Sequence, residues 1–129
     1  MNKNEAKKNI QKLIDKYQIA IDAGKINKYS EEETKKGFIE PLFNILGWDT
    51  TSDEVSAEEY QSSGGRVDYG FYFNDAPKFF LEAKAFKQDI HKEEFARQAI
   101  RYSWNKGVTW AVLTDFESIK VFNAQDVER

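Results

Sequence analysis

The sequence predicts an α/β protein in which a central mixed sheet is flanked by helices. Two observations carry this prediction. Three long stretches repeat apolar residues every three or four positions, as amphipathic helices do, and five shorter runs have the composition and alternation of strands. These stretches follow one another as helix, helix, three strands, helix and two strands, and strands interrupted by a helix are typical of this class.

The first helix is expected from about Asn2 to Ala23. Its apolar residues recur at the helical period, at Ile10, Leu13, Ile14, Tyr17 and Ile21. Gly24 follows this stretch, and glycine commonly ends a helix.

A second helix is expected to begin at Ser30, whose hydroxyl can accept a hydrogen bond from a free amide of the first turn. The three glutamates Glu31 to Glu33 come next and favour the positive end of the helix dipole. Pro41 lies inside this stretch and removes one backbone hydrogen bond, so a kink or break is expected there. Gly47 ends the stretch, whose expected core face is Thr34, Phe38, Leu42, Ile45 and Leu46.

Three strands are expected next. Residues 48–61 form an acidic stretch in which the apolar pattern is weak, with an edge strand expected around Val55. Residues 62–65 have the composition of a flexible turn. Residues 66–73 then alternate as a half-buried strand does, with Asp68 on the face opposite to Val67, Tyr69, Phe71 and Phe73.

A hairpin follows from the turn residues Asn74 to Pro77. Residues 78–86 are expected to return as its second strand. Glu82 and Lys84 stand two positions apart on this strand, so they are expected to share a face.

A third helix is expected over about residues 89–105, ended by Gly107. Residues 108–113 and 118–122 are two further β-rich runs. Residues 1–129 contain no internal repeat or linker, so we expect one domain, with residues 1–29 as an N-terminal helical extension and residues 30–124 as the core.

Composition limits the classes of function. The chain has 129 residues, no cysteine and one histidine, so a metal would be held by oxygen ligands or by the lone His91, and a hard cation such as Mg²⁺ fits that set. No uncharged apolar run is long enough to span a bilayer, so we expect a cytoplasmic protein with no membrane partner. The formal net charge is −3; affinity for duplex DNA comes mostly from cationic contacts to phosphate, so the chain is not expected to hold DNA unaided.

The expected hairpin holds the residues most suggestive of chemistry. Asp68 on one strand is expected to converge with Glu82 and Lys84 on the next. Two carboxylates from paired strands make an oxygen site for Mg²⁺, with the backbone carbonyl of Ala83 as a further candidate ligand. The metal would bridge a phosphate and activate water, and Lys84 would orient that water or stabilise the phosphate. A Glu-x-Lys pair is more often only a solvated charged face, but here it interrupts an apolar strand, where charges need partners.

Several segments between residues 30 and 116 occur in a specific order. They are Ser30-Glu-Glu-Glu-Thr34, Phe38-Ile-Glu-Pro-Leu-Phe43, Leu46-Gly-Trp-Asp49, Gly65-Arg-Val-Asp-Tyr69, Phe80-Leu-Glu-Ala-Lys84 and Ala111-Val-Leu-Thr-Asp115. In this order they resemble the PD-(D/E)xK nucleases, and more narrowly the N-terminal nuclease domains of type I restriction subunits and of type IIG restriction-modification enzymes.

The resemblance implies a restriction-endonuclease-like fold and the metal-dependent DNA endonuclease domain of a restriction-modification system, with Mg²⁺ or Mn²⁺ as cofactor. It implies that Asp68 and Glu82 bind metal and that Lys84 is the catalytic lysine, although valine stands before Asp68 where the motif's name has proline. A helix glutamate often supports such a site. We choose Glu31, which shares a helical face with Thr34 and Phe38; Glu32 and Glu33 stay open, as does a role for all three in favouring the helix N-terminus alone.

Gln98 and Tyr102 match the Gln-x-x-x-Tyr pattern that accompanies the nuclease core in type I restriction subunits and RecB-like nucleases. One helical turn apart, they would contact the DNA backbone or buttress the active-site lysine. The alternative places Tyr102 in the core beside a solvated Gln98.

The implied partners are double-stranded DNA, further domains or subunits for specificity, methylation or translocation, and a transient dimer for cutting both strands. The chain is then an N-terminal fragment of a larger restriction enzyme. Two alternatives remain open. In one, the same fold is inactive on its own and serves as a DNA-positioning or protein-interaction module; in the other, a plain interaction domain carries Glu82 and Lys84 as a surface ion pair.

Overall fold

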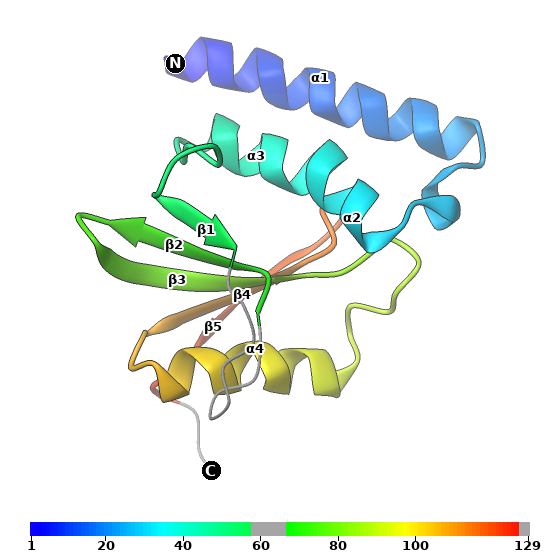
Figure 1. The fold of residues 1–129 in the computed structure, drawn as a ribbon. Coiled ribbons are helices and arrows are strands. Elements are labelled where there is room, and N and C mark those ends of the chain that lie inside the picture. The colour runs from blue at the N-terminus through cyan, green and yellow to red at the C-terminus, as the bar shows by residue number, and fades with distance from the viewer. Residues whose placement is uncertain (58–66, 127–129) are drawn as a thin grey trace.

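The computed structural model describes residues 1–57 and 67–126 of the chain. A five-stranded mixed sheet has helices on both faces (Figure 1), which confirms the predicted α/β class and the predicted order of elements. The helical elements are α1 (Lys3–Asp22), a 3₁₀ turn (Ile26–Lys28), α2 (Glu31–Thr34), a π-helical segment (Lys35–Ile39), α3 (Glu40–Ile45) and α4 (Glu93–Asn105). The strands are β1 (Val55–Ala57), β2 (Tyr69–Phe73), β3 (Ala76–Ala83), β4 (Trp110–Thr114) and β5 (Ile119–Asn123).

Helix α1 begins and ends at the residues that the sequence indicates. The Asn2 side chain accepts a hydrogen bond from the backbone N–H of Glu5 and caps the first turn. Gly24, just beyond the helix, has a φ of 70°, a conformation that glycine adopts without strain. The helix buries Leu13 and Ala20 and packs along α3, so it adds an outer layer to the molecule (Figure 1).

The start of α2 is fixed by a reciprocal pair of hydrogen bonds around Ser30. Ser30 Oγ accepts from the backbone N–H of Glu33 at 3.0 Å, and Glu33 Oε1 accepts from the backbone N–H of Ser30 at 3.0 Å. Both otherwise unpaired amides are thereby satisfied in a capping box.

Replacing Ser30 by alanine is expected to lower the free energy of unfolding by about 1 kcal/mol, because the Glu33 amide loses its acceptor. Ser30→Thr keeps the hydroxyl and serves as the control. Urea denaturation followed by circular dichroism measures both variants. Equal midpoints for the alanine variant and the wild type would show that the cap does not hold this helix.

The irregularity expected at Pro41 is present as the π-helical segment that separates α2 from α3. Pro41 has no N–H to donate to the carbonyl of Gly37, four residues earlier. Lys16 Nζ of α1 donates to that Gly37 carbonyl instead, at 2.8 Å, and also lies 4.6 Å from the centroid of the Phe38 ring. The Gly37 carbonyl, which cannot accept a hydrogen bond from Pro41, thus accepts one from Lys16 of α1.

The stretch from α2 to α3 buries two apolar faces instead of the single predicted one, because it lies between α1 and the sheet (Figure 1). Ile39 and Phe43 pack with Tyr69, Phe71 and Leu81 of the sheet. Phe38 packs with Leu13 and Phe86, and Leu42 and Ile45 pack against that cluster. The prediction was wrong for Leu46, which follows the end of α3 and is 54% exposed.

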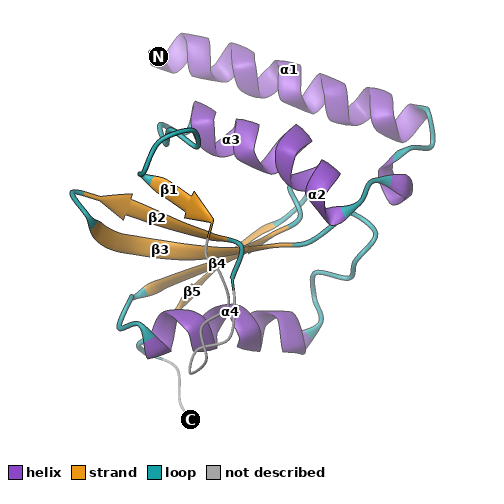
Figure 2. Ribbon diagram, in the orientation of Figure 1, coloured by secondary structure: helices purple, strands orange, loops and turns teal. Residues whose placement is uncertain are grey.

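The strands lie side by side in chain order, β1-β2-β3-β4-β5. Neighbours are antiparallel except for β3 and β4, which are parallel and are joined by α4 across one face of the sheet (Figure 2). The β2–β3 hairpin turns at Asn74 and Asp75, whose φ angles are 50° and 64°. Asparagine and aspartate tolerate this left-handed region, so the turn is tighter than the four residues expected.

Strand β2 begins only at Tyr69, later than expected. Val67 therefore lies before the strand, and its side chain is on a different side of the sheet from the one predicted. Tyr69 and Phe71 pack toward α3, whereas Val67, placed on their side by the alternation, packs with Phe80 and Tyr102 toward α4. Phe73 is 57% exposed near the hairpin turn. The described residues do not include the expected turn at 62–65 or the expected start of the strand at residue 66.

None of the helices in the described ranges, 1–57 and 67–126, is long and apolar enough to cross a membrane.

Candidate active site

The predicted acidic residues converge where β2 begins and β3 ends. Asp68 directly precedes β2, and Glu82 is the second-last residue of β3. Tyr69 is paired with Leu81 in the antiparallel register, so Asp68 and Glu82 extend that pairing by one residue on each strand. Both side chains are buried, at 7% and 4% exposure. The hairpin therefore brings the two carboxylates together in the interior.

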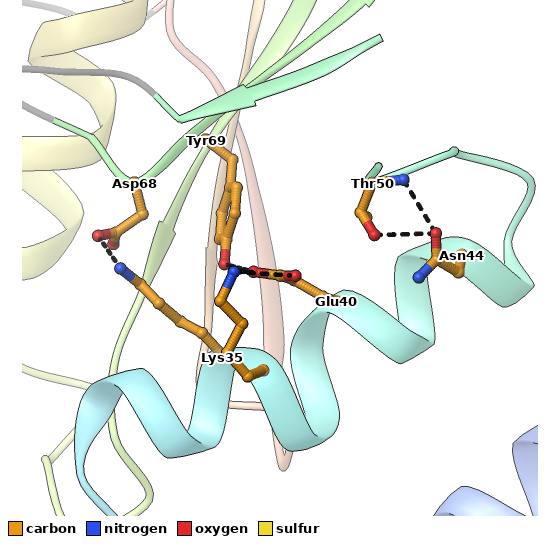
Figure 3. A network of polar contacts seen from close by, with 7 residues as sticks. Lys35, Glu40, Asn44, Thr50, Asp68 and Tyr69 are labelled. Atoms are coloured by element: carbon orange, nitrogen blue, oxygen red, sulfur yellow. Dashed lines mark hydrogen bonds and ion pairs between the residues drawn. The ribbon is translucent and has the colours of Figure 1, made fainter. Parts of the chain in front are cut away.

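Asp68 is held by contacts to both of its carboxylate oxygens. Its backbone N–H donates to the carbonyl of Leu81 at 3.1 Å, and its Oδ2 accepts from the backbone N–H of Ala83 at 2.8 Å. Its Oδ1 lies 2.8 Å from Nζ of Lys35, which reaches the site from the helix that packs over the sheet (Figure 3). The backbone thus fixes Asp68, and Lys35 balances its charge.

Glu82 has an unsatisfied oxygen. Its Oε2 is buried and has no hydrogen-bond partner in the part of the chain that the structure describes. An orphaned buried carboxylate oxygen is costly, and in a native protein it is explained by strain, by a catalytic role or by a bound water or ion. The burial of Glu82 also rules out the alternative in which Glu82 and Lys84 form a surface ion pair.

The two carboxylates share one negative charge. Burial, the hydrogen bond to Asp68 and the charge of Asp68 together raise the pKa of Glu82 to about 9. Burial alone would raise the pKa of Asp68 as well, but hydrogen bonds with Glu82, Lys35 and the Ala83 amide outweigh it and lower this pKa. At neutral pH the pair is therefore a protonated Glu82 donating to an ionised Asp68.

Lys84 lies just beyond the end of β3. Its backbone N–H donates to the carbonyl of Thr114 at 2.9 Å, which continues the parallel pairing with β4. Its Nζ lies 4.3 Å from the centroid of the Phe95 ring, in the first turn of α4, and its charge lowers the pKa of Glu82. Lys84 thus approaches the acidic pair from the α4 side, whereas Lys35 approaches it from the α3 side.

Lys35 is a site residue that the sequence motifs do not indicate. Burial alone would lower the pKa of this lysine, but its hydrogen bond to Asp68 and the charges of Asp68, Glu31 and Glu32 raise it. Lys35 is the first residue of the π-helical segment, and such segments occur frequently at functional sites. The sequence does hold one indication of Lys35: it follows Glu31 by four residues, so both side chains lie on one side of the helix.

The three helix glutamates have different surroundings, although all are exposed. The Glu33 side chain is engaged in the capping box. Glu32 acts by its charge on Lys35 and Tyr69, whereas Glu31 acts on Lys35 and on Glu82. The charge of Glu31, our choice from the sequence, raises the pKa of Glu82, and a supporting role for Glu31 stays a prediction.

Gln98 and Tyr102 lie on α4 as expected, but in different surroundings. Gln98 is exposed, whereas Tyr102 is fully buried and packs edge-on against Phe80, with ring centroids 4.8 Å apart. A phenol with no exposed surface does not reach a DNA phosphate, so direct contact by Tyr102 is the wrong expectation. Tyr102 instead packs with Val67 and Phe80, which stand one residue before Asp68 and two before Glu82.

The donor set at this site suits a divalent cation. Asp68 and Glu82 supply carboxylate oxygens, and Asp68 Oδ1 already attracts a cationic group. Within residues 1–57 and 67–126, Glu82 Oε2 has no partner. No set of three or more acidic, histidine or cysteine side chains in the described ranges is grouped to hold a metal ion. Mg²⁺ needs only one or two protein carboxylates, because water and substrate phosphate complete its octahedron.

These features define the class of protein: an α/β domain whose central strands end in a buried pair of carboxylates with a lysine on either side. Its sequence is similar to part of the type II restriction enzyme and methyltransferase RM.Eco57I of Escherichia coli, with 35% identity over 140 aligned positions. The alignment covers 98% of this chain and only 14% of that protein. No protein-family model and no solved structure matches the chain.

Proposed function

We propose that this chain is the DNA-cleaving domain of a restriction-modification enzyme, a PD-(D/E)xK-type endonuclease that hydrolyses phosphodiester bonds with Mg²⁺ or Mn²⁺. The single observation that carries the proposal is the buried pair Asp68 and Glu82 at the ends of paired strands, with Glu82 Oε2 lacking a partner among the described residues. The similarity over nearly the whole chain to a restriction enzyme and methyltransferase supports the same function.

Each residue of the site has a separate task in the proposed reaction. Asp68 and Glu82 would hold the cation, with the carbonyl of Ala83 as a further ligand. The bound cation would supply Lewis acidity toward the phosphate and toward the attacking water. Lys84, on the α4 side of the pair, would orient that water and stabilise charge on the phosphate oxygens. Glu31 would support the site through its charge, and Gln98, which is exposed on α4, would contact DNA.

The acidic balance of the chain, with a net charge of −3, supports a division of labour with other domains or subunits. Recognition of a DNA sequence, methylation and, in a type I setting, translocation would reside outside these 129 residues. Cutting both strands would require a second copy of the site, which a transient dimer provides. The domain would therefore act on DNA that another part of the enzyme holds.

Nicking of supercoiled plasmid at low salt, with Mg²⁺ or Mn²⁺, tests the proposal. Cleavage is expected with either ion and is expected to stop when the ion is chelated. Lys84→Met is expected to reduce the rate at least about 100-fold, because methionine has a side chain of similar shape but lacks the ammonium that would orient the water and stabilise charge on the phosphate. Lys106→Met, at the far end of α4, is the matched control and should cut at the wild-type rate.

An inactive chain would be assayed again within the polypeptide or complex in which it works. Inactivity there as well, together with no bound Mn²⁺, would overturn the proposal and leave a DNA-positioning or protein-interaction module. Equal rates for Lys84→Met and the wild type would show that the observed cutting comes from another site.

A further inference from the structure

Lys35 occupies a position that a metal ion would compete for. Its Nζ lies 2.8 Å from Asp68 Oδ1, and the two side chains are only 13% and 3% exposed. This is the same carboxylate that the proposed function assigns to the metal, and the remaining Oδ2 is already used by the Ala83 amide. A cation approaching Asp68 Oδ1 therefore meets the ammonium group of Lys35.

The surroundings of Lys35 tie it to this site. Its Nζ lies 5.7 Å from the centroid of the Tyr69 ring, and Tyr69 is fixed by the hydrogen bond that its hydroxyl donates to Glu40 (Figure 3). The ammonium thus lies between an aromatic face and a buried carboxylate. Glu82 Oε2, on the other carboxyl of the pair, finds no hydrogen-bond partner in the part of the chain that is described.

A second location for the ammonium exists one helical turn away. Glu31 precedes Lys35 by four residues, the spacing at which a glutamate and a following lysine attract each other on a helix. The charges of Glu31 and Glu32 already act on Lys35. The lysine has a flexible four-carbon stem, so it can leave Asp68 for these exposed carboxylates without unfolding the helix.

We propose that Lys35 is an internal counter-ion that holds the carboxylate pair in the metal-free protein and is displaced from Asp68 when a divalent ion binds. Lys35 would then set the metal concentration at which the site loads. The inference rests on the proposed function, because it takes Asp68 as a metal ligand. It assigns to Lys35 a positioning role: the lysine acts on the reaction only through Asp68.

Direct titration with Mn²⁺ tests this role without measuring cleavage, because unbound Mn²⁺ has a characteristic electron paramagnetic resonance spectrum. Lys35→Met and Lys35→Gln remove the charge and are expected to bind Mn²⁺ roughly 10- to 100-fold more tightly than the wild type, the range seen when groups around a metal site are changed. Lys35→Arg keeps the charge and should bind as weakly as the wild type. Lys36→Met is the matched control, since Lys36 is the adjacent lysine and pairs with Glu40 at 3.1 Å instead of Asp68.

Thermal unfolding first shows whether the variants are folded. If Lys35→Met is unfolded, Lys35→Gln replaces it, because glutamine retains a donor for Asp68. Unchanged or weaker binding by both charge-removing variants, with Mn²⁺ bound by the wild type, would overturn the counter-ion role and leave the nuclease intact. Absence of Mn²⁺ binding in every variant would overturn the metal-dependent function itself, and the role of Lys35 with it.

Discussion

Asparagine in place of Asp68 is expected to lower metal-dependent cleavage at least about 1000-fold, because this substitution removes both the charge that attracts the cation and an ionised ligand. The Asp68 carboxylate is the group that connects the site: it accepts from the Ala83 amide, pairs with Lys35 and shares a proton with Glu82. Asparagine keeps the shape and an acceptor for Ala83. The fold should therefore persist while Mn²⁺ binding and nicking are lost.

Asp75→Asn is the matched control for this substitution. Asp75 lies in the hairpin turn with a φ of 64°, where asparagine is equally tolerated. It should cut plasmid at the wild-type rate with the same circular dichroism spectrum. If Asp68→Asn nicks plasmid at a rate within tenfold of the wild type, with an unchanged circular dichroism spectrum, Asp68 is not a residue of the active site.

Glutamine in place of Glu82 is expected to stabilise the metal-free protein at pH 8. The folded pKa of Glu82 is about 9, above its ordinary value of 4.5, mainly because the carboxyl is buried. A raised carboxyl pKa favours folding fully below pH 4.5, and this contribution is lost progressively as the pH rises toward 9. Glutamine stays neutral throughout, so the gain at pH 8 should be on the order of 1–3 kcal/mol.

Urea denaturation of the chelated protein at pH 5 and pH 8 measures this effect. The wild type should lose stability between the two values, and Glu82→Gln should lose less. With Mn²⁺ present at pH 8, the wild type should instead be more stable than Glu82→Gln, since the ion stabilises a site with two ionised ligands more than a site with one. Glu94→Gln, an exposed substitution in α4, is the control, and an equal pH slope for Glu82→Gln and the wild type would contradict a buried protonated Glu82.

Most of the architecture could be predicted because the local signals agree with the tertiary structure. Asn2 and Ser30 cap the helices they precede, and Gly24, Gly47 and Gly107 follow helix ends with positive φ angles. The π-helical segment could not be predicted in form, since Pro41 indicates an irregularity and not its kind. Lys16, which donates to the Gly37 carbonyl there, lies on another helix far away in the sequence. Leu46 and Val67 were misplaced because a periodic pattern was continued past the end of the element.

The candidate site was predictable to the extent that strand pairing determines it. Asp68 and Glu82 meet because a hairpin aligns them, and turn residues visible in the sequence predict that hairpin. Their register also depends on an irregularity between Phe71 and Tyr72, which shifts the pairing by one residue and which the turn residues do not predict. Lys35 was not predictable, because its approach depends on how a helix packs over the sheet. The burial of Tyr102 likewise depends on the face that α4 turns toward Phe80.

The parallel pairing of β3 with β4 has a consequence for the order in which the site assembles during folding. The β2–β3 hairpin closes over the two residues Asn74 and Asp75, and hairpins of this kind form in about 1–10 μs. Strand β4 can join only after the chain has passed through α4, and contacts between distant segments form more slowly. Asp68 and Glu82 should therefore meet early, whereas the backbone of Lys84 is fixed later by Thr114. Pulse-labelling hydrogen exchange should accordingly show the Ala83 amide protected before the Lys84 amide.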